Sequence, residues 1–143
     1  MSLHSFDTSM KQRILLIDQS IERRTVIRSL LQEKDFQVLE TGDVQESLQH
    51  LSKLQCDLII ISNCLNEDAF VFIQLIREHE LTYTPIILLG NDLREEPLTI
   101  ARKAGISACL NRPYYLRNAS AFRHITSKIL KKAGLTPLAR ANA

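Results

Sequence analysis

Residues 56–62 read CDLIIIS, and this short stretch decides the fold. Its apolar part, residues 58–61, shows no polar alternation, which is typical of a strand that is covered on both faces. The run ends at a polar residue, Ser62. Open α/β sheets bind their ligands beyond the carboxyl ends of the strands, so Ser62 is the first candidate for a functional position.

Similar runs lie on both sides of this strand along the chain. Short apolar or alternating runs predict further strands at 13–17, 36–40, 85–89 and 107–111. Helical spacing of apolar residues predicts helices at 21–34, after Asp43, around 72–76, before Gly105 and near 119–132. Five strands that alternate with helices imply parallel pairing through right-handed crossovers. The sequence therefore predicts an α/β domain with a doubly wound, five-stranded parallel sheet and helices on both faces.

The same periodicity predicts which helical residues are buried against the sheet. These are Val26, Ile27, Leu30 and Leu31 in the first helix and Phe122, Ile125 and Ile129 in the last.

Composition is consistent with one globular domain. The chain has 143 residues, of which 45% are apolar and 24% charged, enough to build a single core under a polar surface. We expect a flexible leader at 1–12, the domain at 13–132, and a linker or tail at 133–143. Three cysteines, an odd number, indicate buried thiols in a reducing compartment, so we expect a cytoplasmic protein. No apolar run is long enough to span a membrane.

Charge is distributed unevenly along the chain. The last acidic residue is Glu96; residues 1–96 carry a net charge of −7, and residues 97–143 carry +9 with no acid at all. One interpretation is a solvated helix whose last turns carry cations that suit its macrodipole. The other is a docking surface for an acidic partner.

Polar or unusual residues follow each strand at regular positions. LLIDQS contains Asp18 and Gln19, CDLIIIS ends at Ser62, and PIILLG ends at Gly90. CLNRPY contains Arg112 and Pro113, with Cys109 just before them. This order and spacing resemble the receiver domain of two-component response regulators, from Arg13 to about Lys132. The resemblance implies a flavodoxin-like sheet with strand order 2-1-3-4-5.

The resemblance also implies a role for each of these positions. Ser62 stands where the family has its phospho-accepting aspartate, and Asp18 and Gln19 stand at its acidic pair. Gly90 and Cys109 stand at the two switch positions, normally a Thr or Ser and an aromatic residue. Arg112 and Pro113 stand at the family's Lys-Pro pair, whose peptide bond we expect to be cis. Of the polar groups that the family uses at this site, only Asp18 is kept unchanged.

These departures remove the groups that phosphoryl transfer requires. A hydroxyl at Ser62 replaces both the carboxylate nucleophile and a metal ligand, and Gln19 leaves Asp18 as the one acid of the pair. Arg112 keeps a positive charge in a different shape, and Gly90 has no hydroxyl. We therefore expect weak or absent Mg²⁺ binding, no cofactor, no metal site and no catalytic residue. The chain is predicted to be a phosphorylation-independent pseudo-receiver, not an enzyme.

Two alternatives stay open. One is a working receiver that is weakly phosphorylated at an unconventional residue, with Glu67 or Asp68 supplying a displaced acid. The other is a small enzyme that uses the crevice at the strand ends. Against a serine hydrolase, ISNCL is no Gly-x-Ser-x-Gly elbow, and the histidines lie in the leader or on predicted helices.

The basic C-terminal third is the predicted interaction face. We expect its partner to be a signalling protein or output domain with an acidic surface, and a homodimer stays open. Nucleic acid is not expected, because aromatic residues for stacking are few. A membrane partner is not expected either. The cations of this face are Arg102, Lys103, Arg117, Arg123, Lys128, Lys131 and Lys132.

Overall fold

The computed structural model describes residues 12–31, 36–62, 69–78, 84–90, 102–103, 105–111 and 117–134. Its five strands form one parallel sheet in the order β2-β1-β3-β4-β5. This confirms the predicted flavodoxin-like sheet with the apolar run of residues 58–61 in the central strand. The strands are β1 (Gln12–Ile17), β2 (Phe36–Thr41), β3 (Leu58–Ser62), β4 (Ile86–Gly90) and β5 (Ala108–Asn111).

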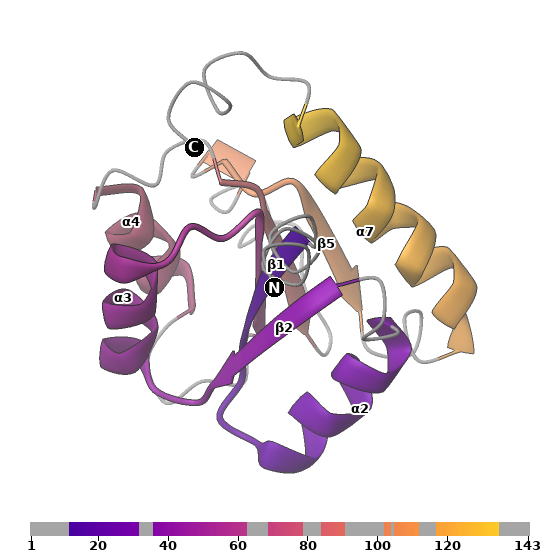
Figure 1. Ribbon diagram of the computed structural model, residues 1–143, viewed down its shortest axis with the longest axis horizontal. Helices are drawn as coiled ribbons and strands as arrows, with labels where there is room; N and C mark the ends of the chain where they lie inside the picture. The colour runs from indigo at the N-terminus through magenta and orange to yellow at the C-terminus, as the bar shows by residue number, and fades with distance from the viewer. Residues whose placement is uncertain are drawn as a thin grey trace, which may run out of the picture.

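Helices cover both faces of this sheet. Figure 1 shows α3 and α4 on one side and α2 and α7 on the other. The result is the three-layered arrangement that parallel strands with crossover helices require. The helices are α2 (Ile21–Leu31), α3 (Val44–Lys53), α4 (Ala69–Glu78) and α7 (Ala119–Gly134).

The central strand contributes to two separate cores. Ile59 and Ile61 belong to the core that α3 and α4 cover, and Leu58 and Ile60 belong to the core under α2 and α7. All four are fully buried, and burying such a side chain stabilises a protein by about 1.5–3 kcal/mol. Because both faces of β3 are packed, its carboxyl end is a rigid position for Ser62.

Asp43 starts α3, as the sequence predicts. Its carboxylate accepts a hydrogen bond from the backbone N–H of Gln45 at 3.1 Å, which satisfies one of the free donors at the helix start. Gly105 has a φ of 86° and its N–H donates to the carbonyl of Arg102 at 3.0 Å, so it ends a helical turn as expected.

One prediction about inward faces is wrong. Val26 is 44% exposed, because the buried side of α2 is centred on Ile27 and Leu31. The inward face predicted for α7 is confirmed at Phe122, which is fully buried, and at Ile129, which packs against the core under α2 and α7. Ile125 is half-buried, and Thr126 and Leu130 complete the buried side of the helix.

Other expectations fall outside the described residues. These include the leader at 1–11, the tail from 135 on, and Cys64. The domain bounds 13–132 stay a prediction. In the part of the chain that the structure describes, no helix is both long and apolar enough to pass through a bilayer.

Candidate functional site

Asp18 and Ser62 occupy adjacent positions at the carboxyl edge of the sheet. Ile17 on β1 pairs with Ile61 on β3, and Asp18 and Ser62 are the next residues on each side. Asp18 is 0% exposed and Ser62 4% exposed. The backbone N–H of Asp18 donates to the carbonyl of Thr41 at 3.1 Å, which fixes this position to the end of β2 as well. The structure thus brings together two of the predicted site residues, one from each strand.

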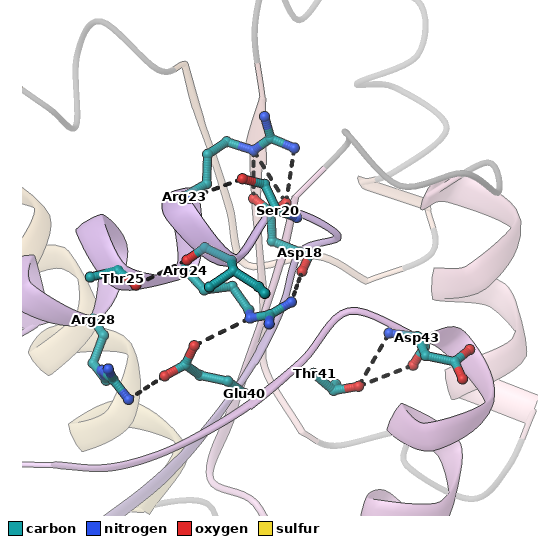
Figure 2. A network of polar contacts seen from close by, with 10 residues as sticks. Asp18, Ser20, Arg23, Arg24, Thr25, Arg28, Glu40, Thr41 and Asp43 are labelled. Atoms are coloured by element: carbon teal, nitrogen blue, oxygen red, sulfur yellow. Dashed lines mark hydrogen bonds and ion pairs between the residues drawn. The ribbon is translucent and has the colours of Figure 1, made fainter.

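The carboxylate of Asp18 is bound by an arginine of its own chain. Arg23 Nε donates to Asp18 Oδ2 at 2.9 Å and to Oδ1 at 3.2 Å, and Arg23 Nη2 donates to Oδ1 at 3.1 Å. The backbone N–H of Ser20 donates to Oδ1 at 2.9 Å. Figure 2 shows the guanidinium lying directly against the carboxylate. A fork of this kind is the strong, directional form of an Arg–carboxylate contact.

The start of α2 holds Arg23 in this place. Ser20 is the residue before the helix, and its hydroxyl accepts a hydrogen bond from the backbone N–H of Arg23 at 3.1 Å. Its carbonyl accepts from the backbone N–H of Arg24 at 3.0 Å. A serine in this position is a favoured helix cap. The cap fixes the backbone of Arg23, and its side chain then reaches back to Asp18.

Two more arginines of α2 extend the network along β2. Arg24 Nη1 donates to the backbone carbonyl of Asp18 at 2.5 Å, and Arg24 Nε donates to Glu40 Oε1 at 3.2 Å. Arg28 forms a further ion pair with the carboxylate of Glu40. Gly42 lies against these groups, since a Cβ there would be 2.7 Å from Arg24 Nη1 and 3.2 Å from the carbonyl oxygen of Asp18. The network is drawn in Figure 2.

The charges of this network do not suit a divalent cation. Among the described residues of this network, two carboxylates, Asp18 and Glu40, face three guanidinium groups, and these five side chains together carry a charge of +1. Mg²⁺ requires oxygen ligands in octahedral order and is normally held by one or two free carboxylates. Among the described residues, no cluster of three or more His, Cys, Asp or Glu side chains could hold a metal. The described residues therefore do not fit a magnesium site.

The switch positions lie on the neighbouring strands. Gly90 ends β4, is buried and pairs with Asn111 on β5. Cys109 on β5 is half-buried and packs against the core under α3 and α4. Burial raises the pKa of the Cys109 thiol, and the Arg102 guanidinium opposes this shift. A neutral thiol at this position is a small packing group rather than a nucleophile.

Some predicted site residues are not described. Arg112, Pro113 and the peptide bond between them lie outside the described residues, as do Glu67 and Asp68. Their predicted roles stay predictions. Gln19 is described, directly after Asp18, and its side chain is exposed.

Part of the predicted interaction face is an exposed ridge on α7. Arg117, Lys128, Lys131 and Lys132 are exposed, and the buried residues of the helix lie on its opposite side. Arg123 is half-buried, and its Nη1 donates to the carbonyl of Leu30 on α2 at 3.3 Å. Arg123 therefore joins α7 to α2 rather than belonging to the exposed ridge.

Arg102 and Lys103 are also exposed, in the turn before β5. The exposed cations Lys128, Lys131 and Lys132 on α7, together with Arg117 just before the helix, are called the α7 ridge below.

The sequence did not point to Arg23, Arg24 or Glu40 as site residues. Arginines near a helix start are common on surfaces, and nothing in their spacing marks them as ligands of Asp18. The signal that was present is the serine directly before the helix, since a cap at Ser20 determines which residues of the first turn face the strand end.

Comparison with known proteins agrees with this geometry. The model of the response regulator receiver domain family matches residues 14–121. This chain belongs to that family. The match places the chain among receiver domains, which are signalling modules.

The chain is also similar to part of a much longer protein. Over 106 residues the chain is 27% identical to the CAI-1 autoinducer sensor kinase/phosphatase CqsS of Vibrio cholerae serotype O1. The match covers 72% of this chain and 16% of that protein, so the chain spans only a small part of the relative's length.

Solved structures share the fold at low identity. The signal receiver domain of an HD domain-containing protein from Pseudomonas fluorescens Pf-5 is 21% identical, with a TM-score of 0.78 over 88% of this chain and 99% of that one. A CheY-like receiver domain protein from Methanospirillum hungatei JF-1 is 15% identical, with a TM-score of 0.73 over 87% and 97% of the two chains. These likenesses show the fold alone.

Proposed function

We propose that this receiver domain works without phosphorylation, as a protein-interaction module in a two-component pathway. The observation that carries the proposal is the pair of adjacent positions Asp18 and Ser62. At the carboxyl end of the central strand, where the family resemblance implies the accepting aspartate, the chain has a buried hydroxyl.

A hydroxyl at this position is a poor phosphoryl acceptor. Serine becomes a nucleophile when a base takes its proton, and the transferred group needs nearby positive charge to stabilise it. The two described histidines are His50 on α3 and His124 on α7, and neither lies at the strand ends. Gln19 adds no negative charge that could help Asp18 bind a metal ion. Neither described histidine is therefore placed to act as the base, and the carboxylate of Asp18 is already bound by Arg23.

The positions that would transmit a phosphorylation signal are altered too. In the family resemblance, a hydroxyl at the end of the fourth strand and an aromatic residue in the fifth move together when the acceptor is modified. Gly90 has no side chain for such a movement, and Cys109 has no ring. Loss of acceptor and of both switch groups together supports a domain with one permanent signalling state.

A permanent state requires a surface that is always presented, and the α7 ridge supports that role. Its cations point away from the sheet, and no acidic residue follows Glu96. We expect the partner to be a signalling protein or output domain with an acidic surface, because complementary charge increases the rate of association. The described cysteines Cys56 and Cys109 are both free, which supports a reducing, cytoplasmic location.

Amide NMR spectra test the absence of phosphoryl chemistry directly. The protein is titrated with Mg²⁺ and beryllofluoride, a mimic of the bound phosphoryl group. We expect no saturable shift of the amides of Asp18, Ser62 and Gly90. A receiver domain that has all the acidic site residues serves as the reference. Saturable shifts at these amides, at the ligand concentrations that saturate the reference, would contradict the proposal.

A further inference from the structure

We propose that Arg23 is a built-in cation that takes the place of a divalent metal ion at the Asp18 carboxylate. The inference rests on the proposed function, because a domain that transfers no phosphoryl group has no need of an exchangeable metal. Arg23 on α2 supplies the positive charge beside Asp18 that a bound metal ion would otherwise supply.

The first argument is the acceptor capacity of Asp18. A carboxylate offers about four lone-pair directions on its two oxygens. Oδ1 accepts from Arg23 Nε, from Arg23 Nη2 and from the backbone N–H of Ser20, and Oδ2 accepts from Arg23 Nε, all between 2.9 and 3.2 Å. The carboxylate is also 0% exposed, so neither oxygen is open to water. A metal ion could bind Asp18 only after Arg23 had moved away.

The second argument is that Arg23 is held where it is. Its backbone N–H is bonded to the Ser20 hydroxyl, and its side chain is only 32% exposed. Removing one member of a buried ion pair is strongly destabilising, because it leaves a buried charge without compensation. Moving Arg23 away would therefore carry a large cost before any metal bond could form.

The third argument is the chemistry of the guanidinium. It stays protonated at every physiological pH, whereas a bound Mg²⁺ exchanges with solvent. The positive charge beside Asp18 is therefore independent of metal concentration. This charge belongs to a residue of α2, so the ion pair fixes the start of the helix to the carboxyl end of β1. The hydrogen bond from Asp18 to the Thr41 carbonyl extends the connection to the end of β2.

The test restores the missing acids and then removes the arginine. In a Gln19→Asp/Ser62→Asp background, Mg²⁺ affinity is measured by isothermal titration calorimetry with and without Arg23→Met. Arg28→Met in the same background is the matched control, because Arg28 belongs to the same network but contacts Glu40 and not Asp18. We expect removal of Arg23 to tighten Mg²⁺ binding at least about tenfold, which is about 1.4 kcal/mol. The control should leave the affinity unchanged.

A second variant keeps the test valid if Arg23→Met does not fold. Arg23→Gln removes the charge and keeps hydrogen-bond donors, and it should also tighten Mg²⁺ binding. Circular dichroism spectra identify which variants are folded. Equal affinity of the acid-restored protein with and without the Arg23 change would overturn the inference, as would equal gains from the Arg28 control.

The two proposals fail in different experiments. Phosphoryl labelling of the unmodified protein would overturn the proposed function. The inference about Arg23 is decided in the acid-restored background, by affinity for the metal alone. Tight Mg²⁺ binding by the unmodified protein at Asp18 would overturn the inference even if no phosphoryl group were transferred.

Discussion

Asp18 and Ser62 are neighbours across β1 and β3, each one residue beyond the paired positions Ile17 and Ile61. The sheet therefore still has the geometry that would present two reacting groups to one ligand. What differs is the chemistry, since one position has a hydroxyl and the other a carboxylate already bound by Arg23. The scaffold depends on apolar packing beneath the site and not on the side chains that the site carries.

The exposed cations of the α7 ridge should determine how fast an acidic partner binds. Lys128→Glu/Lys131→Glu should weaken binding of poly-L-glutamate, used as a probe, and flatten its salt dependence, since rim charges act mainly through long-range attraction. Titrations at low and moderate salt measure both effects. Lys53→Glu, an exposed change on α3, is the control and should have a smaller effect.

Arg123 is unsuitable for that experiment, because its guanidinium bonds to Leu30 on α2 and reversal would disturb helix packing. Unchanged probe binding after reversal of Lys128 and Lys131 would show that the ridge is only a solvated helix face.

Arg77 should stabilise the edge of the sheet where the strands begin, opposite to the candidate site. Its Nη1 donates to the carbonyl of Thr84 and its Nη2 to the carbonyl of Gly105, both at 2.7 Å, which joins α4 to the starts of β4 and β5. Burial lowers the pKa of Arg77. Arg77→Lys cannot span both carbonyls and should reduce the free energy of unfolding by about 1–3 kcal/mol. Urea denaturation measures the loss, and Lys103→Ala, an exposed change nearby in the sequence, should cost little.

The backbone conformation at residue 105 and the nearby Arg77 side chain explain why this residue is a glycine. Gly105 has a φ of 86°, and a Cβ there would be 3.4 Å from Arg77 Nε. A side chain at Gly105 would therefore strain the backbone next to the carbonyl that Arg77 needs. A loss in Arg77→Lys no larger than in Lys103→Ala would show that the two carbonyl bonds contribute nothing to stability.

Thr126 should tolerate loss of its hydroxyl. The side chain is fully buried on α7, and its Oγ1 has no hydrogen-bond partner among the described residues. Thr126→Val keeps the shape and removes the unsatisfied group, so the free energy of unfolding should stay equal or rise by up to about 1 kcal/mol. Leu130→Ala, one turn further along the same face, should instead lose about 2–5 kcal/mol. A clear loss of stability in Thr126→Val would mean that the hydroxyl is bonded.

Much of the fold could be predicted because its signals are local. The runs at 58–61 and 86–89 are apolar at every position, as strands covered on both faces must be, and Asp43 caps the helix that follows it. The sequence predicts less well which side of each helix is buried. Val26 is apolar and next to Ile27, yet it is exposed, because tertiary packing decides the final rotation of a helix.

The candidate site could be predicted only in part. Positions such as Ser62 are set by where a strand ends, which the sequence shows. The contact between Asp18 and Arg23 depends on how α2 turns away from β1, and only the three-dimensional arrangement brings those two side chains together.

Stability should fall at alkaline pH through Cys56. Burial raises the pKa of this thiol from 9.0 to about 11, Asp57 adds to the shift, and Arg13 opposes it. The folded state thus holds the proton more tightly than the unfolded chain. The contribution is complete below pH 9 and is lost as the pH rises to about 11.

Urea unfolding at pH 8 and pH 11 measures this effect, and Cys56→Ala provides the comparison. Other groups titrate in both proteins. The effect of the thiol is therefore the difference between the unmodified protein and Cys56→Ala in how much free energy of unfolding each loses from pH 8 to pH 11. An equal pH dependence in the two proteins would show that Cys56 ionises as easily in the folded state as in the unfolded chain.

Intact-mass spectrometry after incubation with acetyl phosphate and Mg²⁺ tests the central claim most directly. Because no described histidine lies at the strand ends and Asp18 is bound by Arg23, the unmodified protein should acquire no phosphoryl adduct, and its spectrum should match that of Ser62→Ala. An adduct on the unmodified protein that disappears in Ser62→Ala would contradict the account and make this chain a phosphorylated receiver.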